Sequence, residues 1–274
     1  MLDSAGVGRP IRLVGALAGL PVAGGLFAFV QVMRAAHRSD LPSFTNQDAS
    51  GVWGDAALPP LRIVAVGDSS LTGPGIEDPA DIFVSRLARS AADRYRVELI
   101  SIGVGGSRVR DVIEGQLAEA VRLRPDLAVV SVVTNDAIRA TPLARFRRDL
   151  DLILSRLEEV AAAVILLGMG DPGSVPRLPP TIRPFVTWQG RRFDAACVEV
   201  ATRHPRIIKV NSRGRMTSAF WEDRSLFAGD LFHANGRGHG VFAEETRDAF
   251  EAALLMVERR RGASRATGCG LAAD

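Results

Sequence analysis

Short apolar runs alternate with amphipathic stretches along residues 61–258 of the chain. The runs are rich in Val, Ile and Leu, as expected for strands that are buried on both faces. The predicted strands are 61–66, 97–102, 127–133, 163–169 and 206–210. The predicted helices lie near 79–93, 107–122, 143–160, 188–203 and 237–258. This order predicts βαβ units around a parallel sheet, and therefore an α/β fold in the form of a three-layer α/β/α sandwich.

Residues 13–33 are largely apolar and contain no charged side chain. As a helix that rises about 1.5 Å per residue, this segment would span about 30 Å, the thickness of a bilayer core. We therefore expect an N-terminal hydrophobic helix that anchors the protein in a membrane. A signal peptide cleaved after Ala18 and a buried or surface-lying helix remain alternatives. Arginines flank the segment on both sides, so charge indicates its orientation only weakly.

These patterns divide the chain into four segments. Residues 1–36 hold the hydrophobic segment, and residues 37–60 are polar and interrupted by Pro and Gly, which is typical of a linker. Residues 61–257 form one domain, a length that supports a well-buried core. Residues 258–274 are basic, small and polar, so we predict a disordered tail.

Charge and composition narrow the classes of partner. The net charge is only +3 despite a pI of about 9.4, and the arginines are spread along the chain, so we expect no nucleic-acid partner. The two cysteines, Cys197 and Cys269, do not suggest a disulfide or a thiolate metal site. Four histidines without HExxH or paired His/Cys spacing argue against a catalytic metal. We expect no metal and no cofactor.

Four short segments of polar residues and glycines lie at predicted turns next to the sheet. In an open parallel sheet, ligands bind outside the carboxyl ends of the strands, where such turns meet. Ser69 stands in a tight turn, glycines expose backbone N–H groups near a helix start, and Asn135 adds a neutral amide. The segments are 67–70 (GDSS), 103–107 (GVGGS), 134–136 (TND) and 230–233 (DLFH).

Each segment has a simpler explanation when it is taken alone. GDS is compatible with an ordinary turn, Asn135 with a helix cap and DLFH with a surface turn. A dinucleotide-binding loop would need glycine where the chain has Arg108. In DLFH, the spacing of three lets the carboxylate of Asp230 reach the ring N–H of His233 and fix its tautomer. We interpret His239, in or near the following helix, as structural.

Taken together and in this order, the four segments resemble the sequence blocks of the SGNH (GDSL-type) hydrolases over residues 61–257. The resemblance implies a serine esterase that needs no cofactor. Ser69 matches the nucleophile of the family, and Asp230 and His233 match the other two members of its triad. The oxyanion hole would be formed by the backbone of Ser69 and Gly106 and by the side chain of Asn135.

Three positions depart from the usual family pattern. Thr134 replaces the glycine before the asparagine, Ser101 replaces an asparagine that often starts the glycine block, and Ser70 replaces Leu or Ile. None of these changes removes a catalytic group. The β-branched Thr134 is expected either to narrow the pocket or to shift the backbone of Asn135, so this departure bears on substrate size more than on activity.

The implied reaction is the hydrolysis of a small-molecule, lipid or glycan ester. His233 would take the proton of Ser69, an acyl-enzyme would form, and water would release the acid. The Pro-rich segment 168–185 is expected to form one wall of the cleft and to influence the choice of acyl group. With the anchor, this predicts a membrane-bound or exported enzyme whose catalytic domain lies outside the cytoplasm. An acyltransferase, a cell-envelope polysaccharide O-deacetylase and a non-catalytic binding module remain alternatives.

Overall fold

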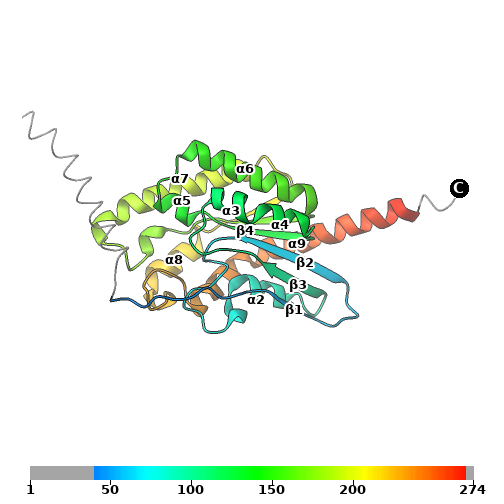
Figure 1. The fold of residues 1–274 in the computed structure, drawn as a ribbon, viewed down its shortest axis with the longest axis horizontal. Coiled ribbons are helices and arrows are strands. Elements are labelled where there is room, and N and C mark those ends of the chain that lie inside the picture. The colour runs from blue at the N-terminus through cyan, green and yellow to red at the C-terminus, as the bar shows by residue number, and fades with distance from the viewer. Residues whose placement is uncertain (1–39, 270–274) are drawn as a thin grey trace, which may run out of the picture.

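The computed structural model describes residues 40–269, which form a six-stranded sheet covered by helices on both faces (Figure 1). The strand order is β1-β3-β2-β4-β5-β6, and all neighbours are parallel except β1 and β3. The strands are β1 (Gly51–Trp53), β2 (Pro60–Gly67), β3 (Arg96–Ser101), β4 (Leu127–Ser131), β5 (Ala163–Leu167) and β6 (Ile207–Val210). The predicted α/β architecture with a largely parallel sheet is therefore confirmed.

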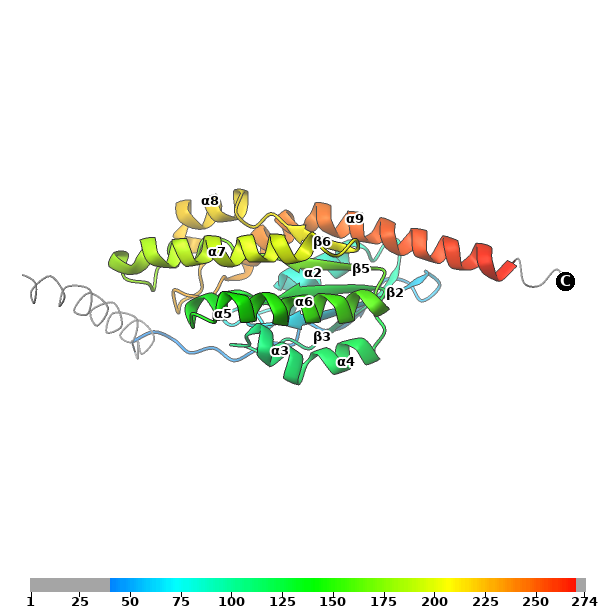
Figure 2. The same cartoon turned by 90° about the horizontal axis from the view of Figure 1, so that it is seen from above.

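Two groups of helices form the outer layers. One face carries α2 (Phe83–Ser90), α8 (Arg215–Glu222) and α9 (Gly236–Cys269). The other face carries α3 (Val109–Gly115), α4 (Leu117–Arg122), α5 (Thr134–Ile138), α6 (Leu143–Val160) and α7 (Arg183–Ala201). Figures 1 and 2 show these layers, with the far end of α9 projecting beyond the sheet. Four short 3-10 helices complete the described elements: η1 (Pro79–Asp81), η2 (Pro172–Ser174), η3 (Pro180–Ile182) and η4 (Arg224–Leu226).

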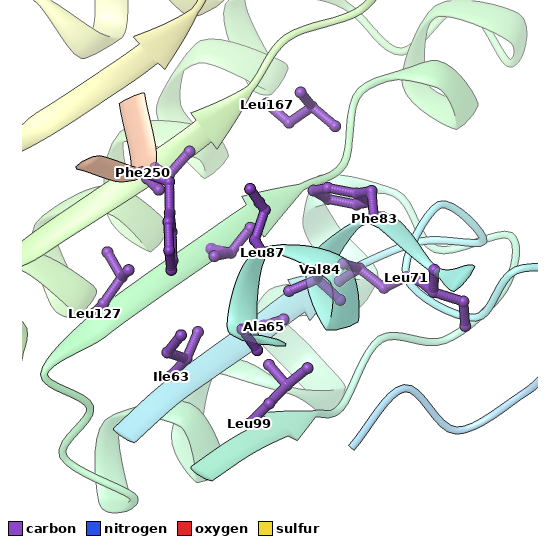
Figure 3. Packing of buried hydrophobic residues seen from close by; sticks show 14 of the residues in the cluster. Ile63, Ala65, Leu71, Phe83, Val84, Leu87, Leu99, Leu127, Leu167 and Phe250 are labelled. Carbon is purple, nitrogen blue, oxygen red and sulfur yellow. The ribbon is translucent and has the colours of Figure 1, made fainter. Parts of the chain in front are cut away.

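Alternate side chains of the central strands enter two separate hydrophobic cores. In β2, Ile63 and Ala65 pack with Phe83 of α2 and Phe250 of α9 (Figure 3), whereas Val64 packs on the opposite face. Successive residues of a strand point to opposite faces, so a strand buried on both sides must be apolar almost throughout. This requirement explains why the central strands could be recognised as continuous apolar runs.

The order of the strands reverses at β2. The chain passes from β2 to β3 on one side and then crosses back to β4 on the other side. At such a point the loops after the two neighbouring strands diverge and leave a crevice outside their carboxyl ends. Ser69 follows β2 and Asn135 lies in the first turn of α5, which follows β4, so both predicted site residues lie at this crevice.

The secondary structure differs from the prediction in several places. The strand limits agree to within two residues, but β1 and the short helices α5 and α8 were not predicted. The predicted helix 107–122 is divided into α3 and α4 at Gln116, whose φ and ψ of −127° and −36° depart from helical values. The helix predicted near 188–203 begins earlier, at Arg183.

The segments outside the predicted domain also need correction. The predicted linker 37–60 contains β1, and Gln47 donates a backbone hydrogen bond to Thr72. The predicted disordered tail 258–274 is helical as far as Cys269, because α9 continues through it. The hydrophobic segment 13–33 lies outside the described residues. Within residues 40–269, none of the helices is long and apolar enough to cross a membrane.

Candidate active site

The end of β2 holds Ser69 in a tight turn against β4. Gly67 has a φ of +152°, and a Cβ atom there would lie 1.9 Å from the carbonyl oxygen of Ser131. The backbone N–H of Asp68 donates to the same oxygen at 2.9 Å. The Ser69 carbonyl then accepts a hydrogen bond from the N–H of Gly73 at 3.0 Å. Only glycine fits this close approach, so Gly67 fixes where the half-buried Ser69 leaves the sheet.

Gln116 supports this turn from the break between α3 and α4. Its side-chain oxygen accepts from the N–H of Gly67 at 2.8 Å, and its amide group donates to the Gly67 carbonyl at 3.0 Å. The same amide donates to the hydroxyl of Ser107 at 3.3 Å. Sequence reasoning missed Gln116, because a single glutamine in a helical pattern gives no signal of a long-range partner.

Three hydrogen-bond donors lie in the segments that follow β2, β3 and β4: the backbone N–H groups of Ser69 and Gly106 and the side-chain amide of Asn135. Gly106 has a φ of +82°, which favours glycine. Among residues 40–269, no protein acceptor binds the backbone N–H of Ser69 or of Gly106. The side-chain amide of Asn135 donates to the Ser107 carbonyl at 3.1 Å and lies 3.4 Å from a carboxylate oxygen of Asp68. These are the three donors that the resemblance assigned to an oxyanion hole.

The position of Asn135 argues against its role as a helix cap. The residue at the N-cap of α5 is Val133, which makes no side-chain capping bond. Asn135 instead lies in the first turn of α5, with its amide held toward the loop after β3 by the Ser107 carbonyl. Asn135 is therefore not the N-cap of α5, so the helix-cap alternative is wrong, and its side-chain amide lies at the crevice.

Asp230 and His233 form a close pair in the turn before α9. The ring Nδ1 of His233 lies 2.6 Å from the Asp230 Oδ2, while Oδ1 accepts from the N–H groups of Phe232 and His233 at 3.0 Å each. Burial acts to raise the pKa of Asp230, but the His233 ring and the two amides outweigh it and lower the pKa. Asp230 is therefore ionised and orients the ring, as the spacing predicted.

A strained residue shapes this turn. Leu231 has a φ of +58°, which is uncommon for a residue with a branched side chain. Its N–H donates to the Ala228 carbonyl, and its own carbonyl accepts from the N–H of Arg177 at 2.9 Å. The turn that carries His233 is thus tied to the Pro-rich segment.

Asp68 links the DLFH turn to the Ser69 turn. Burial raises the pKa of Asp68 to about 6, although hydrogen bonds from Ser70 and the charge of His233 oppose this rise. The direct chain neighbours of Ser69, Asn135 and His233 line one pocket, and Asn135 is joined to the residue after Gly106 through the Ser107 carbonyl.

A largely apolar pocket of about 150 Å³ adjoins this group of residues. It is lined by Ser70, Thr134 and Phe232, the direct neighbours of Ser69, Asn135 and His233, rather than by those three residues. Its apolar lining comes mainly from the residues after β4, from the end of β5 and the loop that follows it, and from α8. These residues are Val132, Val133, Leu167, Met169, Val175, Met216, Phe220, Phe227 and Phe242.

The Pro-rich segment forms one wall of the pocket, as predicted for 168–185. Gly168 through Val175 supplies most of this wall, and Asp171 fixes it. The Asp171 carboxylate accepts hydrogen bonds from the hydroxyl of Thr187 on α7 at 2.7 Å and from the indole N–H of Trp221 on α8 at 3.1 Å. The wall is therefore anchored to two helices, which favours a pocket of defined shape.

His239 lies apart from this chemistry. It is 2% exposed, and its Nδ1 accepts a hydrogen bond from the N–H of Phe83 at 3.2 Å. Burial lowers the pKa of His239 to about 3, so the ring is neutral. These contacts agree with the prediction that His239 is structural. In the part of the chain that the structure describes, no cluster of His, Cys, Asp or Glu is arranged to hold a metal.

Comparison with protein families identifies the domain. The model of the GDSL-like lipase/acylhydrolase family matches residues 65–241, which include Ser69, Gly106, Asn135, Asp230 and His233. The chain belongs to this family. It is therefore a carboxylic ester hydrolase. A comparison with curated proteins gave no match.

Solved structures share the fold of this family member. A lipase/acylhydrolase from Enterococcus faecalis is 22% identical, with a TM-score of 0.56, over 70% of this chain and 96% of the other. The esterase EstA from Pseudoalteromonas sp. is 15% identical, with a TM-score of 0.56, over 70% and 98%. The acetylxylan esterase Axe2 from Geobacillus stearothermophilus is 16% identical, with a TM-score of 0.51, over 72% and 95%. At these identities the likeness concerns the fold.

Two of the departures from the family pattern meet at the pocket. The hydroxyl oxygens of Ser70 and Ser131 lie 2.6 Å apart, and Thr134 lines the same cavity. In this member of the GDSL-like family, the otherwise largely apolar pocket thus has a small polar patch beside Ser69. Ser101, the third departure, does not line the pocket, and its backbone N–H donates a hydrogen bond to the hydroxyl oxygen of Ser50 at 3.0 Å.

Proposed function

We propose that the enzyme is a serine esterase in which Ser69 is the nucleophile, His233 the general base and Asp230 the residue that orients it. The observation that carries the proposal is the 2.6 Å contact between His233 and the ionised, buried Asp230. A ring that donates through Nδ1 leaves Nε2 free to accept a proton. His233 takes the proton of Ser69, whose oxygen attacks the ester carbonyl and forms an acyl-enzyme, which water then hydrolyses.

The tetrahedral oxyanion is bound by the backbone N–H groups of Ser69 and Gly106 and by the Asn135 amide. The support is that both N–H groups lack an acceptor among the described residues and that the Asn135 amide is already oriented by the Ser107 carbonyl. Donors fixed before the reaction stabilise the transition state without the cost of reorientation. The contact of Asn135 with Asp68 at 3.4 Å is long, so one amide hydrogen can turn to the oxyanion.

The pocket of about 150 Å³ receives the acyl group. An apolar cavity of about this size holds benzene, so the pocket has room for roughly six carbon atoms. An acetyl group, as in the substrate named for the similar acetylxylan esterase, would fill only part of this space. The geometry therefore favours esters of short linear acids, with about four to six carbons, over acetates and long-chain lipids.

The location of the enzyme is a separate proposal that rests on the sequence. The uncharged segment 13–33 is long enough to anchor the chain in a membrane and to hold the catalytic domain outside the cytoplasm. If the segment is an anchor, full-length protein stays in the pellet when membranes are washed with alkaline carbonate. Release of the full-length chain into the wash would disprove the anchor.

A fluorophosphonate probe tests the nucleophile, because such reagents phosphonylate serines activated by a base, with loss of fluoride. Peptide mapping of the labelled enzyme is expected to find the probe on Ser69, and Ser69→Ala should take up none. Ser70→Ala is the matched control, since its hydroxyl lies next in the chain and lines the pocket but has no place in the triad. Labelling of Ser70, or unchanged labelling of Ser69→Ala, would contradict the proposal.

A further inference from the structure

Arg139 follows α5, the helix that carries Asn135. The backbone N–H of Arg139 donates to the Asn135 carbonyl at 3.0 Å, so the turn between them is helical. Residues four positions apart lie on the same face of a helix. The guanidinium of Arg139 therefore lies on the side of α5 that carries the Asn135 amide.

The Arg139 guanidinium reaches the rim of the proposed oxyanion hole. Its Nη2 lies 3.8 Å from the position that a Cβ atom on Gly106 would take. Arg139 is exposed, and within residues 40–269 it forms no salt bridge. The carboxylate of Asp111, which senses its charge, is instead bound by Arg108 at 3.3 Å. A cation without a bound protein anion thus stands beside Gly106.

The turn after Arg139 holds this arrangement in place. Ala140 has a φ of +51°, an uncommon conformation for alanine. The N–H of Thr141 donates to the Asp136 carbonyl at 2.9 Å, and the buried Asp136 carboxylate accepts from the N–H of Val109 at 2.8 Å. Strained backbone persists where surrounding contacts fix it, often beside a functional site.

The arginine lies outside the pocket. Neither Gly106 nor Arg139 is among the residues that line it, and Gly106 follows β3, which pairs with β2 on the side away from β4. When the acyl group fills the pocket and the carbonyl oxygen is bound in the proposed oxyanion hole, the alcohol part of the ester stays outside the pocket, where a substituent can reach the guanidinium of Arg139.

We propose that Arg139 binds an anionic group, a carboxylate or a phosphate, on the alcohol part of the substrate. This inference rests on the proposed function, because it takes Ser69 as the point of attack. A planar guanidinium binds either anion through two parallel hydrogen bonds. The arrangement makes Arg139 a specificity-determining residue, and the preferred substrates are esters of short acids with negatively charged alcohols.

Two esters with the same acyl group test the inference with the full-length enzyme. They are 3-carboxyphenyl butanoate, which is anionic, and 3-carbamoylphenyl butanoate, which is neutral. For Arg139→Gln we expect kcat/KM on the anionic ester to fall about 10-fold or more, as for the loss of a hydrogen bond to a charged group. The neutral ester should change less than twofold. Arg148→Gln, which removes another exposed arginine from α6, should change neither value.

Binding of the product gives a second readout that needs no turnover. Wild-type enzyme should bind 3-hydroxybenzoate more tightly than 3-hydroxybenzamide in calorimetry, and Arg139→Gln should lose this preference. Equal falls on both esters, or an unchanged anionic preference in Arg139→Gln, would overturn the role of Arg139 and leave the esterase intact. Absence of turnover of both esters by the wild type would count against the proposed function, while the calorimetry would still decide the anion site.

A further pair of substrates separates the two sources of such an anion. Butanoylglycerol 3-phosphate is soluble, whereas short-chain phosphatidylglycerol carries its phosphate in a lipid headgroup. Loss of activity in Arg139→Gln on the first compound indicates a soluble phosphate ester, and loss on the second indicates a lipid. Unchanged activity of the variant on both compounds would exclude phosphate as the anion and leave carboxylate, which the first pair tests.

Discussion

Filling the acyl pocket from Gly170 should shorten the acyl groups that the enzyme accepts. Gly170 lines the pocket and has no left-handed backbone conformation. A Cβ atom there would lie 3.6 Å from the Ser212 carbonyl oxygen and 3.7 Å from the sulfur of Met216, both ordinary contacts. Gly170→Val is therefore compatible with the backbone, and its three added carbons occupy about half of a space for roughly six.

The size of the fall in kcat/KM follows from the number of methylene groups of the acyl chain that no longer fit in the pocket. Each buried methylene contributes about 0.8 kcal/mol, so displacing two or three of them costs about 1.6–2.4 kcal/mol. This corresponds to a fall of about 15- to 60-fold in kcat/KM for hexanoate relative to acetate. The assay is hydrolysis of 4-nitrophenyl esters from acetate to decanoate, with kcat/KM measured for each chain length.

A glycine far from the pocket provides the control. Gly262 lies in α9 with no atom within 4 Å of an added Cβ, so Gly262→Val should keep the chain-length profile of the wild type. The assignment of the acyl pocket would be refuted if Gly170→Val kept this profile as well. An equal fall on acetate and hexanoate would also refute it, because a filled acyl pocket must discriminate by length.

Two other substitutions test the hydrogen-bond and proton assignments. Asn135→Ala should lower kcat by about 10²- to 10³-fold with little change in KM, since the amide binds the oxyanion more strongly than the carbonyl oxygen of the bound ester. Near-normal turnover with a lowered melting temperature would exclude Asn135 from the oxyanion hole. The folded pKa of His239 is about 3 against 6.5 for the free side chain, so acid protonates the unfolded chain first and stability falls as the pH drops below about 6.5. Between pH 7 and pH 5 the free energy of unfolding of the wild type should therefore fall by about 2 kcal/mol through His239 alone. His239→Asn lacks this titrating group and should not show that part of the fall when both proteins are unfolded in urea at the two pH values. An equal loss in both proteins would contradict the burial argument.

The fold was predictable where the signal is local. Strands such as 163–167 are buried on both faces, so they must be apolar throughout, and this pattern is visible without the structure. β1 could not be found in this way, because three residues carry no periodic pattern and Gly51 disfavours a strand by itself. The tail beyond residue 258 is helical despite its polar composition, because a long helix already anchored in the core continues into it.

In the candidate site, too, local contacts were predictable from the sequence and long-range contacts were not. Asp230 and His233 were predictable because their contact lies within one turn of the chain, and the spacing fixes it. The contact between Gln116 and Gly67 joins residues that are 49 positions apart. The position of Arg139 beside Gly106 could not be predicted, because it depends on how α5 packs against the loop after β3. Such contacts follow from tertiary packing, which a single sequence does not display.

The short strand β1 limits how the enzyme can be trimmed. A fragment beginning at Leu61, where hydropathy places the start of the domain, would lose the three residues that pair with β3. The outer backbone groups of β3 would then be open to pairing with a second copy, which is a common origin of aggregation. The same cut removes Asn46, which accepts a hydrogen bond from Thr72 just beyond Ser69. A soluble, active fragment should therefore begin at or before residue 45.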